Sequence, residues 1–200
     1  MTDIYGQQHR ALQQDFATEK LADAVSASIV LPEIPDEHRG FIETRDLFFL
    51  TTIDHRGFPT CSYKGGNPGF VRVIDRKTLA FPSFDGNGMY LSMGNITANP
   101  RIGMLFIDFE TPHRVRVHGT ASIDPDDPLK AEIAGAELVV RVEVGEIFVN
   151  CPRYIHRTAA GEMSPYAPRE GYTPPEPKWK SMAMFVDVLP GRGSKDAAER

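Results

Sequence analysis

Short apolar runs separated by turn signals dominate the chain from residue 47 onward, and they constrain its fold more than any other feature. The run at 47–53 is rich in strand-favouring residues, and the following Asp54-His55-Arg56-Gly57 is typical of a turn. Further strand candidates lie at 60–64, 70–74, 78–82, 102–109, 114–123, 138–144 and 183–189. Regularly spaced short strands predict a barrel or a sandwich, so we expect a mainly β (α+β) fold with flanking helices.

The first part of the chain has a helical character. Residues 7–27 carry an incomplete apolar stripe at helical spacing, which predicts one helix. Pro32 and Pro35 end it, and residues 36–45 predict a second, short helix. We therefore expect a helical extension at 1–34, a single barrel domain at 35–190 and a flexible tail at 191–200.

Charge and composition exclude several classes of protein. The formal net charge of −5 argues against a general nucleic-acid binder. The start of the chain lacks a secretory signal pattern, and no apolar run is long enough to span a bilayer, so we expect a cytoplasmic protein without a membrane partner. Cys61 and Cys151 are expected to be reduced. The six histidines, His113 and His118 included, lack metal-ligand spacing, so no metal is expected.

One strand candidate runs into a Gly-rich turn that opens a helix. Met89, Met93 and Ile96 recur at helical spacing, Asp85 or Asn87 can cap the start, and Asn99-Pro100 ends the helix. The free amides at such a start, expected here at residues 86–88, bind phosphate groups well. A tight turn followed by a helix cap, with no ligand, is the alternative.

Basic residues occur on the neighbouring strand candidates. Lys64 ends one candidate and Arg72 lies in the next. In the run at 114–118, strand alternation places Arg114, Arg116 and His118 on one face of the sheet. This face is either an anion-binding surface or an ordinary exposed strand with solvated charges.

The chain resembles the pyridoxamine 5′-phosphate oxidase-like flavoproteins in four runs, at 45–52, 57–59, 79–83 and 95–106. The resemblance covers residues 35–125. It implies a six-stranded split β-barrel and a homodimer that binds flavin mononucleotide (FMN) at the subunit interface. The cofactor-binding residues that it implies, together with the basic candidates above, are Ser62, Tyr63, Lys64, Arg72, Phe81, Pro82, Ser83, Asn87, Gly88, Asn95, Arg114, Arg116 and Trp179.

Two departures from the family pattern limit what the resemblance implies. Asn87 and Gly88 stand where the oxidases place an Arg-Lys pair on the phosphate, so helix amides, Lys64 or Arg72 must replace those contacts. The substrate-binding Arg-x-His motif of the oxidases is not evident near the C-terminus, so oxidation of pyridoxamine phosphate is not expected.

We expect an FMN-dependent oxidoreductase that moves electrons between a reduced nicotinamide or other donor and a small acceptor. The sequence assigns no catalytic residue, because the reactive chemistry belongs to the cofactor. Three alternatives stay open: a deazaflavin (F420) as cofactor, a non-enzymatic protein that binds or stores flavin, and a structural dimer with a vacant cleft. The roles of Cys151 and His156 are also open.

Overall fold

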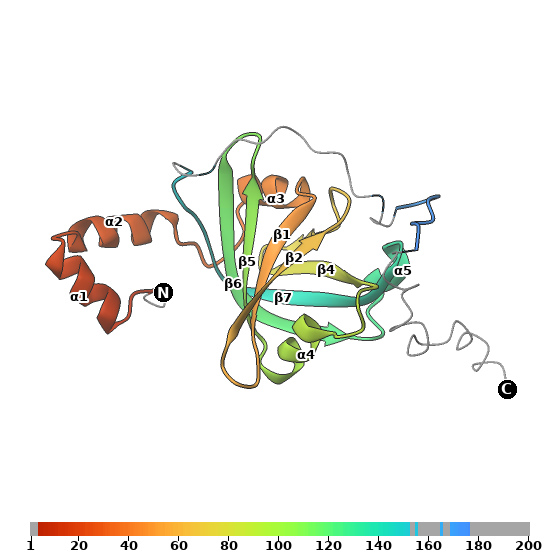
Figure 1. Cartoon of the computed structure of the whole chain (residues 1–200). Helices are drawn as coiled ribbons and strands as arrows, with labels where there is room; N and C mark the ends of the chain where they lie inside the picture. The colour runs from red at the N-terminus through yellow and green to blue at the C-terminus, as the bar shows by residue number, and fades with distance from the viewer. Residues whose placement is uncertain (1–3, 153–154, 156–164, 166–168, 177–200) are drawn as a thin grey trace.

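The computed structural model describes residues 4–152, 155, 165 and 169–176. Helices α1 (Gln7–Asp15) and α2 (Glu19–Ile29) form an arm that projects from the body of the molecule (Figure 1), and α3 (Asp36–Glu43) follows. The strands are β1 (Leu47–Ile53), β2 (Pro59–Gly65), β3 (Arg72–Asp75), β4 (Thr78–Phe84), β5 (Arg101–Asp108), β6 (His113–Asp124) and β7 (Ala136–Val149). Helix α4 (Leu91–Ala98) joins β4 to β5, and α5 (Leu129–Glu132) joins β6 to β7.

The strands form one antiparallel sheet in the order β2-β1-β5-β6-β7-β4-β3. The sheet curls round its core, and the predicted mainly β split barrel with flanking helices is confirmed. The sheet has seven strands where the resemblance implied six, and each of the seven strand ranges predicted between residues 47 and 144 overlaps an observed strand. The candidate at 183–189 lies outside the described residues.

The core of the barrel is built on alternate residues of the strands. Along β1 the even-numbered residues are buried and the odd-numbered ones are half-exposed. The ring of Phe48, which is fully buried, lies 5.0 Å from that of Phe81, 5.2 Å from that of Phe106 and 5.9 Å from that of Phe70, measured between centroids. This aromatic cluster ties β1 to strands β4 and β5 and to the loop before β3.

The other side of β1, β2, β5 and β6 forms a surface that we call the outward face. Its central row follows the strand register from Tyr63 through Phe49 and Leu105 to Arg116. Tyr63 and Arg116 are exposed, whereas Phe49 and Leu105 are half-buried. The outward face therefore combines apolar side chains with a basic edge.

The helix predicted at 7–27 is in fact two helices. Ala17 adopts a left-handed backbone conformation (φ 53°), which no residue of a continuous right-handed helix can adopt, and the chain turns there between α1 and α2. No glycine or proline marks this break, so the apolar spacing alone could not reveal it. None of the helices in the described ranges is long and apolar enough to cross a membrane.

The close approach of Gly119 in β6 to strand β7 gives a test of the barrel's packing. The register of β6 against β7 shifts between His118 and Gly119, and a Cβ added at Gly119 would lie 2.5 Å from the carbonyl oxygen of Glu143. We expect Gly119→Ala to lower the free energy of unfolding by about 1–3 kcal/mol, measured by urea denaturation. Gly103→Ala is the matched control, because its Cβ would meet its nearest atom at 3.7 Å. Equal stability of the two variants would contradict the packing argument.

Candidate functional site

Helix α4 begins later than the sequence predicted, and this moves its free amides. Its N-cap is Tyr90, in a left-handed conformation (φ 47°), and no side chain caps the helix. The prediction that Asp85 or Asn87 caps it is therefore wrong. Gly88, at φ 77°, keeps residues 86–88 in a turn, in which the Asn87 side chain accepts a hydrogen bond from the Met89 amide at 3.1 Å.

The amides at the start of α4 belong to residues 91–93. The first backbone hydrogen bond of the helix runs from the Gly94 amide to the Tyr90 carbonyl at 2.7 Å, so the amides before it precede the helical ladder. They carry the positive end of the helix dipole. The Gly-rich turn lies beside them rather than within the helix.

A pocket of about 240 Å³ lies at this helix start. Strand β2 contributes Ser62 and Lys64, β4 contributes Ser83 and Phe84, and α4 contributes its first turn. The loop between β4 and α4 completes the wall with Gly86, Asn87, Gly88 and Tyr90. Five of the predicted cofactor-binding residues therefore meet in one place: Ser62, Lys64, Ser83, Asn87 and Gly88.

Hydroxyl groups and one ammonium group converge in this α4 pocket. The Ser62 and Ser92 hydroxyl oxygens lie 3.1 Å apart, and Lys64 Nζ donates to Ser92 Oγ at 3.4 Å. Burial lowers the pKa of Lys64, because removing water penalises its charged form. An anionic group bound here would favour the charged form of Lys64 and accept hydrogen bonds from the surrounding donors.

Asn95 has a structural position one turn further along α4. It is buried, and its side-chain amide donates to Thr52 Oγ1 at 3.0 Å and to Thr60 Oγ1 at 3.2 Å. These bonds attach α4 to β1 and β2, so Asn95 holds the helix in place without lining the pocket.

The predicted arginines lie away from the α4 pocket. Arg72 forms an ion pair with Glu132 of α5, which compensates its charge. Arg116 is on the outward face, and Arg114, two residues earlier in β6, donates from Nη2 to the Cys151 carbonyl at 3.1 Å. The predicted alternation on β6 is confirmed, because Val115 and Val117 are fully buried on the inner side.

The remaining predicted residues also lie outside the pocket lining. Tyr63 points to the outward face, where its ring packs edge-on against Phe49. Phe81 and Pro82 are buried in β4, just before the two residues of that strand that reach the pocket. Trp179 falls outside the described residues.

Comparison with protein families gives a match to the family described as pyridoxamine 5′-phosphate oxidase over residues 34–151. This span is more than half of the chain. The chain belongs to this family. A search of curated proteins finds no match.

Several solved structures of low sequence identity are similar to this family member. HupZ of Group A Streptococcus is 21% identical, with 64% of this chain and 99% of that chain covered and a TM-score of 0.47. HutZ of Vibrio cholerae, described as a heme storage protein, is 18% identical, with 56% and 92% covered and a TM-score of 0.44. An F420 reductase is 20% identical, with 58% and 98% covered and a TM-score of 0.42.

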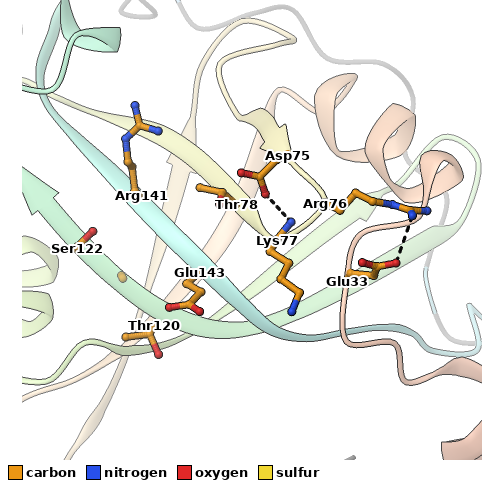
Figure 2. Close-up of a pocket in the computed structure, with 10 residues that line it drawn as sticks. Glu33, Asp75, Arg76, Lys77, Thr78, Thr120, Ser122, Arg141 and Glu143 are labelled. Atoms are coloured by element: carbon orange, nitrogen blue, oxygen red, sulfur yellow. Dashed lines mark hydrogen bonds and ion pairs between the residues drawn. The ribbon is translucent and has the colours of Figure 1, made fainter.

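A larger hollow of about 760 Å³ lies elsewhere on this oxidase-family barrel, between the β3–β4 turn and strands β6 and β7 (Figure 2). Much of its charge is compensated within the chain: Arg76 pairs with Glu33 at 3.4 Å, and Arg141 pairs with Asp127. The Asp75 carboxylate accepts a hydrogen bond from the Lys77 amide at 2.7 Å and so stabilises the turn. The hollow therefore attracts an anion less than the α4 pocket does.

The residues at the start of helix α4 that line the α4 pocket were not predicted from the sequence. Tyr90, Leu91, Ser92 and Met93 line the pocket but were not among the predicted site residues. The signal was present in part, because the apolar spacing of Met93 and Ile96 is satisfied by a helix starting at 91. Only the left-handed backbone of Tyr90 fixes that start.

Proposed function

We propose that this chain binds FMN with its phosphate in the α4 pocket, in a seam between two copies of the chain. It uses the flavin to move electrons between a reduced nicotinamide or other donor and a small acceptor. The observation that carries the proposal is the convergence of helix amides, the Lys64 ammonium and the hydroxyls of Ser62, Ser83 and Ser92 in one pocket. Such a donor set suits a phosphate dianion.

The residues present fit the phosphate end of the cofactor. At about 240 Å³ the α4 pocket is below the roughly 300–1,000 Å³ typical of small-molecule sites, so one chain encloses only part of an FMN molecule. The exposed side chains of Met89, Tyr90 and Leu91 stand beside the pocket and offer apolar surface to a ring. A second copy would supply the rest of the enclosure.

When bound, FMN supplies the redox chemistry, and the protein binds it, orients it and tunes its charge. The Lys64 ammonium and the first-turn amides of α4 would hold the phosphate, and the Ser62 and Ser92 hydroxyls, which lie beside Lys64, would fix its orientation. Arg114 or Arg116, reaching across from the second copy, would stabilise negative charge on the reduced ring. We expect Arg116→Ala to lower the reduction potential of the bound flavin, measured by dye-coupled titration, and an unchanged potential would exclude this role.

The absorption spectrum of the purified protein tests the cofactor directly. We expect a yellow protein that releases a compound with the mass of FMN on denaturation. A colourless protein that takes up no added FMN would overturn the proposal, and release of a deazaflavin would replace the cofactor. Steady-state turnover with reduced nicotinamides and a panel of acceptors separates an oxidoreductase from a protein that only binds flavin.

The burial of Lys64 predicts a pH dependence of FMN binding. A bound phosphate favours the charged lysine, so affinity is highest while Lys64 is protonated and falls as pH rises through its pKa in the free protein. Because burial lowers that pKa below the usual 10.5, the fall begins at a lower pH than for an exposed lysine. Fluorescence titration at increasing alkaline pH measures it. Lys64→Gln is the control, since any fall that it retains comes from the flavin itself.

A further inference from the structure

The two helices of the arm carry apolar side chains that no described part of the chain covers. Leu12 of α1 is 59% exposed, and Phe16, directly after α1, is 75% exposed. In α2, Leu21 is 64% exposed and Val25 is 40% exposed. In each pair the residues are four apart, so they form one stripe on the helix surface. Neither helix contains a buried residue.

The described contacts between the two helices of the arm are polar and stabilise it weakly. Its helices are 9 and 11 residues long, below the roughly 12–15 residues at which isolated helices become even marginally stable in water. They are joined by polar contacts, such as the Arg10–Asp23 ion pair at 2.6 Å and the bond from the Tyr5 hydroxyl to the Ala22 carbonyl at 3.1 Å. Exposed contacts of this kind stabilise weakly. Burial of the apolar stripes against another surface would stabilise both helices further.

The point where the arm leaves the barrel indicates what covers these stripes. Leu31 exchanges two backbone hydrogen bonds of 2.9 Å with Ile147 of β7, which anchors the arm to the sheet. The next residue, Phe148, pairs in register with Arg116, and this pairing continues the row of the outward face through Leu105. The arm therefore starts at the border of the outward face and extends away from its own barrel (Figure 1).

We propose that the arm of each copy packs its apolar stripes onto a second copy of this chain, at the edge of an interface in which the two outward faces meet. The inference rests on the proposed dimer. The same chain presents both an uncovered apolar stripe and an apolar outward face with half-buried Phe49 and Leu105. In a two-fold assembly both are covered at once, and the assembly closes without further copies.

Photo-crosslinking with isotope-mixed protein tests which chain the arm contacts. A benzophenone amino acid replaces Phe16 in the full chain, and light protein and ¹⁵N-labelled protein are mixed, dissociated and reassembled before illumination. We expect crosslinked peptide pairs of mixed isotope composition that join the arm to the barrel. Gln7 lies on the opposite side of α1 and is the control position, where few such crosslinks are expected. Crosslinks only within one chain, or none, would overturn the proposal.

Sedimentation equilibrium gives an independent readout. We expect the double variant Phe16→Glu with Leu21→Glu to raise the dimer dissociation constant by about 100-fold, because two apolar side chains lose their burial. Ala27→Glu, an exposed position away from the α2 stripe, should leave the constant unchanged. Equal constants for both variants would contradict the arm contact. Flavin content is measured on the same samples: a colourless protein with crosslinks between chains refutes the cofactor alone, and a yellow protein without them refutes the arm alone.

Discussion

Lys64→Ala is expected to weaken FMN binding by about 10- to 150-fold, the largest loss of affinity from any single substitution in the α4 pocket. Lys64 is the one lysine or arginine among the described residues that line this pocket. A charge-assisted hydrogen bond contributes about 1.5–3 kcal/mol, which corresponds to that range of dissociation constants. Fluorescence titration of the flavin-free protein with FMN measures the change.

Riboflavin separates the phosphate contact from the ring contact. It lacks the phosphate, so Lys64→Ala should alter its affinity far less than that of FMN. Lys77→Ala is the matched control, because Lys77 is an exposed lysine of the β3–β4 turn, outside the α4 pocket. If Lys64→Ala and Lys77→Ala bind FMN equally well, the phosphate does not lie against Lys64.

Phe48→Ala is expected to lower the free energy of unfolding by about 3–5 kcal/mol. Phe48 is fully buried between three other phenylalanine rings, and truncation leaves a cavity that the surrounding strands cannot fill. Domains of this size are stable by only about 5–15 kcal/mol, so a large part of the stability is lost. Urea denaturation followed by tyrosine and tryptophan fluorescence measures it.

Phe58→Ala removes the same number of atoms from an exposed site. Phe58 is 61% exposed in the β1–β2 hairpin, where the Arg56 guanidinium carbon lies 5.3 Å from the centre of its ring. The free energy of unfolding should change by about 0.5 kcal/mol or less. A similar loss in both variants would mean that the aromatic cluster does not form the core of the barrel.

The strands of this barrel were predictable because their signals are local. The run at 47–53 and the alternation of Arg114, Val115 and Arg116 each indicate a strand, and β1 and β6 confirm them. The order of the strands was not predictable. The pairings of β1 with β5 and of β4 with β7 join segments far apart in the chain, and no local pattern records them.

The candidate site also has a part that the sequence could predict and a part that it could not. Ser62, Lys64 and Ser83 could be named from their place in the family pattern, and they line the α4 pocket. The amides were assigned to residues 86–88 instead of 91–93, because one left-handed residue, Tyr90, sets where the helix begins. Arg72 was a reasonable cation on sequence grounds, yet its ion pair with Glu132 depends on a helix between β6 and β7.

The two strands that build the α4 pocket stand far apart in the order of the sheet. Strand β2 is at one end, and β4 is next to the last strand at the other end. A phosphate bound by both Lys64 of β2 and Ser83 of β4 would link the two ends of the sheet and so stabilise the closed form of the barrel. FMN should then slow hydrogen exchange along both strands, and raise the melting temperature, because it binds the closed barrel and not the unfolded chain.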